Sequence, residues 1–237
     1  VDTDKPITYI KLYYGLEEIS AYRRYWDEVE PIVVGEGLYT AAVDVMHLNK
    51  PLFAYASVKY EGGYYLSTPV KCVLPVDIGC TVAGAQERKV IYKARENLIG
   101  WGASSIGTDP IPSQLYAPIL TAAKEGGVTV ARSTVIPWTH RLYDPRFFAP
   151  SDKSRLKITF RGFPANVTVS IQDVFRVDAT PYSCSKQLQK DDMSLTVGLQ
   201  DLVSEEGTIR TSWSQSPQLQ FSGLATGCYI DSIEWIS

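Results

Sequence analysis

The sequence predicts an all-β protein made of two β-sandwich domains. Its 237 residues include 15 Tyr and 5 Trp but only 2 His and 2 Met, and such an aromatic-rich composition favours strands and exposed ring surfaces. Several short segments alternate apolar and polar residues with the two-residue period of a strand. No strands alternate with helices in the way that a parallel sheet requires.

The N-terminal third reads as short strands separated by turns. Strands are expected at residues 7–14 (ITYIKLYY), 39–45 and 52–60. Glu61-Gly62-Gly63 is a hairpin signal that leads into YYLSTPVKCVLP. Residues 17–30 leave two interpretations open, because their charges suit a short helix and their aromatic residues suit strands broken by a loop.

A polar, glycine-containing stretch at residues 81–89 is the expected linker between domains. It divides the chain into a first domain at 1–82 and a second at 83–237. Residues 95–118 hold several Gly and Pro residues and are expected to be largely irregular, and residues 115–125 are the best helix candidate.

The C-terminal third carries clear strand patterns. RLKITF at 155–160 and VTVSI at 167–171 alternate regularly around the turn RGFPAN, which predicts a hairpin. Further strands are expected at 195–199, 219–221 and 229–236, where apolar residues again alternate with others. Within the last of these, two isoleucines are three residues apart, so both face the core only if the strand bulges near Asp231 or Ser232.

Charge and motifs exclude several function classes. A net charge of −3 with dispersed basic residues gives no stripe for a phosphate backbone, so nucleic acid is not an expected partner. No apolar run reaches the roughly 20 residues of a membrane helix, and no membrane partner is expected. The first residue is Val1, which suggests a mature or trimmed product of something longer. Motifs of serine hydrolases, zinc proteases and nucleotide-binding proteins are absent, and no catalytic residue is assigned.

Four cysteines form an even set without metal-type spacing. Two disulfides are possible, and the simplest pairing joins Cys72 to Cys80 and Cys184 to Cys228. Free thiols are the alternative, because spacing alone does not fix connectivity.

The densest polar and aromatic cluster is WTHRLYDPR at residues 138–146. One interpretation is a sugar-contacting region, in which Trp138 stacks on a pyranose while the arginine and aspartate side chains of the cluster, such as Arg141 and Asp144, bind its hydroxyl groups. His140 and Tyr143 are further candidate sugar contacts in the same cluster. The other is an ordinary loop whose tryptophan caps the core. A β-sandwich polysaccharide lyase or glycosidase that uses this cluster also remains open.

The first domain resembles the central and later part of a fibronectin type III or immunoglobulin-like sandwich. The resemblance is carried by ITYIKLYY, RYW at 24–26, GLYTAAVDV at 37–45 and PLFAYASVKYEGGYYLSTPV at 51–70. Such domains follow the catalytic domain in some secreted bacterial hydrolases.

The last 45 residues resemble the end of a jelly-roll, galactose-binding-like carbohydrate-binding module. The resemblance lies in MSLTVGLQDLVSEEG, TSWSQSPQLQFSG and GCYIDSIEW, with SDKSRLKITFRG as an earlier strand of the same fold. It implies a noncatalytic sandwich with sugar-binding rings. The candidates are Trp101, Trp138, Tyr143, Tyr182 and Trp213. It also implies a structural calcium ion on Asp231, with Glu87 and Glu96 as possible further ligands.

The function expected from these features is noncatalytic carbohydrate binding. The chain would be the accessory region of a secreted, extracellular polysaccharide-active hydrolase or esterase, with a polysaccharide or glycan and a catalytic domain or chain as partners. The alternatives are an enzyme in its own right, as above, and a structural module that packs on a catalytic domain without binding sugar.

Overall fold

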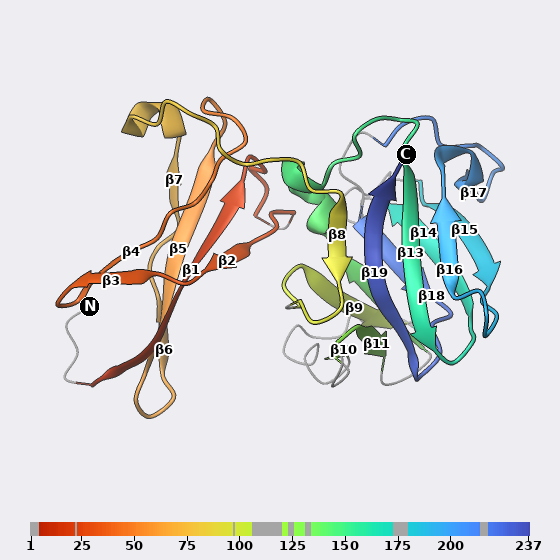
Figure 1. Ribbon diagram of the computed structural model, residues 1–237, viewed down its shortest axis with the longest axis horizontal. Coiled ribbons are helices and arrows are strands. Elements are labelled where there is room, and N and C mark those ends of the chain that lie inside the picture. Colours follow the sequence, from red (N-terminus) through yellow and green to blue (C-terminus); the bar gives the residue numbers. More distant parts are fainter. Residues whose placement is uncertain are drawn as a thin grey trace. The chain divides into compact units, whose positions relative to one another are not determined.

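A computed structural model describes residues 5–21, 23–96, 98–105, 120–122, 126–130, 134–172, 180–213 and 218–237. Every strand pairing in it is antiparallel, and the only helical elements in the described ranges are short 3-10 turns. The chain is therefore all β, as the sequence predicts (Figure 1). It divides into two compact units: residues 1–86 with Asp144–Arg146 form unit 1, and residues 87–143 with 147–237 form unit 2.

Unit 1 contains a five-stranded sheet in the order β2-β1-β5-β6, with β7 paired to the other part of the same β5 edge. Its strands are β1 (Ile7–Leu16), β2 (Asp27–Val29), β5 (Leu52–Tyr60), β6 (Tyr65–Ser67) and β7 (Lys71–Val73). A separate hairpin joins β3 (Ile32–Gly35) to β4 (Leu38–Thr40), and the 3-10 turn η1 (Pro75–Ile78) follows β7. The expected turn at Gly62-Gly63 joins β5 to β6, which confirms that hairpin.

Two expectations for unit 1 are settled by these elements. Residues 17–30 form no helix in the described positions, and their only regular element is the short strand β2. The strand expected at 39–45 is shorter than predicted, because β4 ends at Thr40.

The core of unit 1 lies on one face of β1 and β5. Tyr14, Leu16, Val45 and Leu52 form a buried cluster there. The phenol of Tyr14 emerges from this cluster to accept a hydrogen bond from Nη1 of Arg146 at 2.6 Å. Arg146 also contacts the carboxylate of Asp27 at 3.0 Å, so the 144–146 segment closes a polar network within unit 1.

Unit 2 contains two six-stranded sheets that lie face to face (Figure 1). The first sheet has the order β10-β11-β19-β13-β16, with β8 also paired to β19. Its strands are β8 (Val90–Lys93), β10 (Leu120–Ala122), β11 (Val128–Val130), β13 (Arg155–Gly162), β16 (Ser194–Val197) and β19 (Cys228–Ile236).

The second sheet of unit 2 has the order β17-β15-β14-β18-β12-β9. Its strands are β9 (Trp101–Ser105), β12 (Val135–Thr139), β14 (Asn166–Gln172), β15 (Tyr182–Gln187), β17 (Val203–Ser204) and β18 (Gln218–Ser222). Three 3-10 turns complete the unit: η3 (Arg141–Tyr143), η4 (Pro145–Phe147, partly in unit 1) and η5 (Leu199–Asp201).

Alternating apolar residues from both sheets fill the interior of unit 2. Leu156, Ile158 and Phe160 of β13 are at most 2% exposed, and Val167, Val169 and Ile171 of β14 are fully buried. The two strands belong to different sheets, however, since β13 pairs with β16 and β19 and β14 pairs with β15 and β18. The predicted hairpin of 155–171 is therefore wrong, because the turn carries the chain from one sheet to the other.

The bulge predicted in the last strand is confirmed. Thr159 lies opposite Ser232 and Phe160 lies opposite Ile230, so Asp231 is the extra residue between them. The bulge allows Ile230 and Ile233 both to be fully buried.

The helix expected at 115–125 is contradicted at residues 120–122, which form β10 and pair with β11. The remainder of that segment, and most of the irregular region expected at 95–118, lies outside the described residues. Within the described part of that region, Trp101–Ser105 forms strand β9. The possible disulfides do not form either, because all four cysteines are free. Among the described residues, no helix has the length and apolar character needed to cross a membrane.

Candidate functional site

One continuous row of side chains crosses all six strands of the second sheet of unit 2. The strand register places its members directly opposite one another, in the order Val203, Ser183, Ser170, Gln220, Trp138 and Gly102. We call this set the cross-sheet row. None of its members carries a charge or titrates near neutral pH.

The cross-sheet row faces away from the core of unit 2. The residues next to it along three strands, Val169, Phe221 and Thr139, are all 0% exposed, and successive residues of a strand point to opposite faces. Ser170 and Trp138 are only half-buried, in keeping with this alternation. The row is thus available at the outer surface of the sheet.

Trp138 is the aromatic member of the row and lies across its partner on the neighbouring strand. A Cβ atom on Gly102 would come within 2.3 Å of the Trp138 ring. The indole therefore occupies the space into which the side chain of any other residue at position 102 would extend. The lack of a side chain at Gly102 leaves room for the ring to pack over the neighbouring strand. The centroid of the His140 ring lies 5.7 Å from the centroid of the Trp138 ring.

His140 adds no charge to this face at neutral pH. Burial, and after it the neighbouring positive charge of Arg141, lower the pKa of His140 to about 4. The imidazole is therefore neutral at pH 7, as the rest of the row is.

A second, shorter row of hydroxyl groups runs beside the first. Ser185, Thr168 and Ser222 lie opposite one another on β15, β14 and β18. The hydroxyl oxygens of Thr168 and Ser185 are 2.7 Å apart and hydrogen-bonded. Together the two rows offer hydroxyl and amide groups around one indole, which suits a neutral, hydroxyl-rich ligand.

Three of the predicted sugar-binding residues are buried and have no surface for a ligand. Arg141, Tyr143 and Trp213 are 3%, 2% and 5% exposed. Arg141 donates hydrogen bonds to the carbonyl oxygens of Ile99 and Ile91, and its position is that of a structural brace. Trp213 donates its indole N–H to the Ser154 carbonyl at 2.9 Å and packs in the core.

Trp101 takes part in packing as well. Its ring contacts Tyr92 edge-on at 5.1 Å and Phe221 at 5.9 Å, and both of these residues are buried. It therefore points to the opposite side of the sheet from Trp138. Of the predicted residues, the structure brings only Trp138 and His140 together on the outer face.

The predicted calcium ligands do not gather into a site. Asp231 accepts a hydrogen bond from Nε of Arg161 at 2.8 Å, and Glu96 pairs with Arg141 at 2.7 Å. Glu87 is exposed. Within the described residues, no three His, Cys, Asp or Glu side chains are grouped to hold a metal ion.

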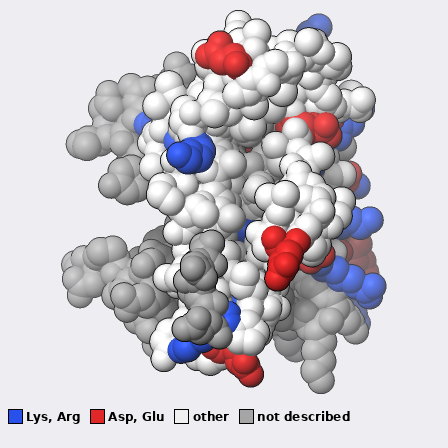
Figure 2. Space-filling view, turned by 90° about the vertical axis from the view of Figure 1, so that its left-hand side faces the viewer, with Lys and Arg blue, Asp and Glu red and all other residues white. Residues whose placement is uncertain are grey.

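Sequence reasoning missed the polar members of the cross-sheet row. Gln220 and Ser170 are unremarkable residues within strand patterns, and their meeting with Trp138 depends on the pairing of β18 with both β12 and β14. The available signal was the polar half of the alternating segments QLQFS and NVTVSIQ. On the face drawn in Figure 2, acidic and basic side chains form small separate groups among uncharged ones.

Comparisons with known proteins add little to this description. No family model matches the chain, and no curated protein matches it. Among solved structures, one match comes from work on the promiscuous specificity of carbohydrate-binding modules of the β-sandwich superfamily, with 12% identity and a TM-score of 0.30. The match covers 100% of this chain and 88% of that one. A similarity at this level assigns neither a fold family nor a ligand.

Proposed function

We propose that the chain is a noncatalytic carbohydrate-binding region that holds a neutral glycan on the outer face of the second sheet of unit 2. The observation that carries the proposal is the cross-sheet row, in which Trp138 packs over Gly102 and shares the row with Gln220 and Ser170, without any charged neighbour in the row. An indole face packs against the C–H groups of a pyranose, and amide and hydroxyl groups orient its hydroxyls.

The wider setting of this function is part of the same proposal. The resemblances to fibronectin type III and jelly-roll modules support an accessory role in a secreted polysaccharide-active hydrolase or esterase. A catalytic domain or chain would then carry out the hydrolysis, while this chain would bind the polysaccharide substrate.

The test begins with binding of the purified chain to a panel of insoluble polysaccharides and to a glycan array. Replacement of Trp138 by Ala is expected to weaken binding to the retained neutral glycan by at least about tenfold, because it removes the stacking ring. Binding should be unchanged between low and high salt, since the row carries no charge. Isothermal titration calorimetry on a soluble oligosaccharide of the same glycan gives the numbers.

Two further variants separate loss of the ring from loss of the fold. Gly102→Ala keeps the indole but displaces it, because the new Cβ would lie 2.3 Å from the ring, and it should also weaken binding. Tyr64→Ala removes an aromatic side chain that is 61% exposed in unit 1 and should leave binding unchanged. Absence of binding in both screens, or an equal loss in the Tyr64 variant, contradicts the proposal.

A further inference from the structure

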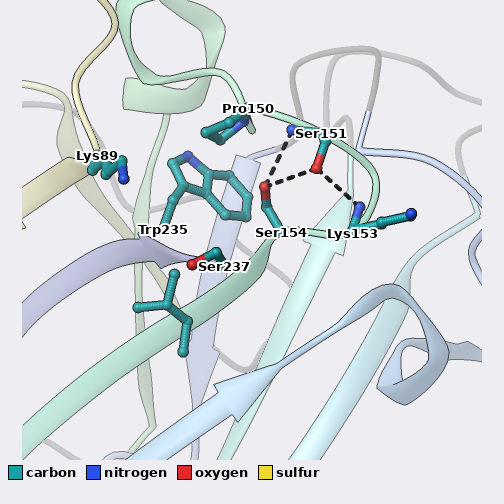
Figure 3. A pocket seen from close by; sticks show the side chains of 8 residues that line it. Lys89, Pro150, Ser151, Lys153, Ser154, Trp235 and Ser237 are labelled. Carbon is teal, nitrogen blue, oxygen red and sulfur yellow. Dashed lines mark hydrogen bonds between the residues drawn. The ribbon is translucent and has the colours of Figure 1, made fainter.

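Most of the exposed large apolar residues in the described chain belong to unit 1. Unit 2 covers its large rings well: even Trp235, which lines a pocket of about 430 Å³ at the end of β19, is only 4% exposed (Figure 3). In unit 1, by contrast, Ile32, Val33, Val34 and Leu38 of the β3–β4 hairpin are between 55% and 68% exposed. Apolar residues exposed together in this way mark a surface for a partner.

The β3–β4 hairpin is a ribbon of two strands without a core of its own. Every residue of both strands is exposed, and in the described chain neither strand pairs with any other. Val33 shares one side of the ribbon with its partner Tyr39, and Ile32 lies on the other side with Thr40, so both sides carry apolar groups. A two-stranded ribbon is at best marginally stable in water, and this one gains stability when another strand covers it.

A strand edge without a partner lies on β1. On one side β5 pairs along almost the whole strand, whereas on the other side β2 pairs only with residues 12–14. Continuation of the β2 register would bring Pro31 opposite Ile10, and proline has no N–H to donate. Residues 7–11 therefore have an open edge among the described residues, and such an edge is a template for a further strand.

The hairpin and the open edge carry charges of opposite sign. Glu30 and Glu36 lie before and after β3, both are exposed, and neither forms an ion pair with a described residue. At the open edge, Lys11 of β1 pairs with Glu28 at 2.7 Å. Lys59, on the adjacent β5, has no carboxylate partner in the part of the chain that the structure describes. One lysine at this edge is thus not neutralised within the molecule.

Two more charged residues lie at the same end of the sheet. Lys5 comes shortly before β1, and Glu61 follows β5 and donates its backbone N–H to the Pro6 carbonyl at 2.9 Å. With these included, lysines outnumber carboxylates among the described residues at this end, while residues 30–40 carry carboxylates only. Two hairpins that met each other would bring like charges together, so the complementary contact joins a hairpin to the open edge.

We infer that unit 1 mediates self-association, in which the β3–β4 hairpin of one copy adds to the open edge of β1 in a second copy. In a reciprocal arrangement each copy gives one hairpin and receives another, and the dimer closes. Backbone hydrogen bonds along residues 7–11 hold the added strand, and the Glu36 carboxylate lies near Lys59. The inference concerns unit 1 and is independent of the glycan binding proposed for unit 2.

Sedimentation equilibrium of the purified chain between about 1 µM and about 1 mM measures the association. The mass is expected to rise from the 26.3 kDa of the single chain towards twice that value. Hydrogen exchange on the same samples should slow at the backbone amides of residues 7–11 and 32–40 as the dimer forms, because strand addition brings them into hydrogen bonds. A single-chain mass at every concentration, or a dimer without this protection, overturns the inference.

Variants of exposed apolar residues assign the surface. Ile32→Asp with Leu38→Asp places charges on the hairpin and should weaken the dimer at least about tenfold. Phe163→Asp, at a side chain of unit 2 that is 68% exposed, is the matched control and should leave the association unchanged. Circular dichroism verifies that each variant is folded. An equal effect of the control, or no effect of the hairpin variant, contradicts the assignment.

Exchange of charges tests the pairing of the hairpin with this particular edge. Glu36→Lys and Lys59→Glu should each weaken the dimer by about two- to fivefold, as expected for an exposed ion pair. The chain with both changes should associate more tightly than either single variant, because each new lysine then meets a new glutamate of the other copy. A double variant as weak as the two single effects combined would show that the hairpin does not dock on this edge.

Discussion

The two arginines at 141 and 146 occupy similar places in the sequence and have different structural roles. Arg141 contacts the backbone of Ile91 and Ile99, and so it ties together two segments of unit 2. Arg146 forms a two-point contact with Asp144, at 2.9 Å for both pairs of atoms, although these residues are only two apart. Both side chains are at most 3% exposed, so most of the cluster that suggested a binding loop is the packing of a buried turn.

His140 makes the stability of the protein depend on pH. Burial lowers the pKa of His140 to about 4 in the folded state, while an unfolded histidine titrates near its ordinary 6.5. As pH falls from about 6.5 to about 4, the unfolded state therefore binds a proton that the folded state does not, and the free energy of unfolding decreases. Below about pH 4 this loss is complete.

Urea denaturation at pH 7 and at pH 4.5 measures the effect of His140. The replacement His140→Asn removes the titrating group and should reduce the difference in the free energy of unfolding between the two pH values. A difference of the same size in the variant would show that other groups cause the acid destabilisation.

Among the elements, β19 depends most on a single residue. It is the central strand of the first sheet and pairs with β8, β11 and β13. Asp231 interrupts its alternation, so that Ser232 also faces outward before Ile233 turns back to the core. At the bulge, the Asp231 carbonyl accepts a hydrogen bond from the backbone N–H of Ala94 at 2.7 Å.

Deletion of Asp231 should be tolerated and deletion of Glu234 should not. Without Asp231 the strand alternates without interruption and keeps Ile230 and Ile233 in the core. The loss is then one half-exposed ion pair with Arg161 and one backbone hydrogen bond, about 1–3 kcal/mol in total. Without Glu234, Trp235 turns outward and its bond to Phe147 is broken, which should cost about 4 kcal/mol or more.

Thermal unfolding followed by circular dichroism compares the two deletions. A folded, slightly destabilised protein is expected without Asp231, and an unfolded or aggregated one without Glu234. Equal damage from both would show that the bulge, and not the alternation around it, determines the position of the strand.

The strands could be predicted from sequence better than their partners. Alternation located β13, β14 and β18 correctly, because burial on one face imposes a two-residue period. It also located the bulge, since two buried isoleucines three residues apart permit no regular strand. It could not show that β13 and β14 belong to different sheets, because the same turn residues serve a hairpin and a crossing between sheets.

For the whole molecule, the structure distinguishes between the two interpretations of the four cysteines, because all four are free thiols. Cys184 belongs to β15 and Cys228 to β19, which are strands of different sheets. Burial raises the pKa of Cys228 to about 11 and also raises that of Cys184. Cys72 and Cys80 are exposed, so the four thiols should differ widely in reactivity.

Alkylation of the native protein with iodoacetamide at pH 8, followed by mass spectrometry of peptides, tests this order. Cys72 and Cys80 are expected to react first, and Cys228 only after denaturation. Quantitative labelling of all four cysteines in denaturant without a reducing agent should confirm that the thiols are free. A mass lower by the hydrogens of two disulfides would contradict it.

The candidate site was predictable only in part, and the reason is geometric. The sequence identified Trp138 and His140 because they lie in a dense local cluster. Gln220 and Ser170 reach the same surface from strands about 80 and 30 residues further along the chain. Trp138 also differs from Trp101 and Trp213 because its ring lies on the outer face of the sheet and theirs pack in the interior. The sequence did not show which face of its strand each ring occupies.

The three residues Asp144–Arg146 have a practical consequence for anyone who divides the chain. A gene fragment that stops at codon 86 would encode every strand of unit 1 and still omit Arg146. Tyr14 and Asp27 would then lose the guanidinium group that they share. If such a fragment were unstable or aggregated, the cause would be the missing Arg146 contacts. The result would not show that the strands of unit 1 are unable to fold.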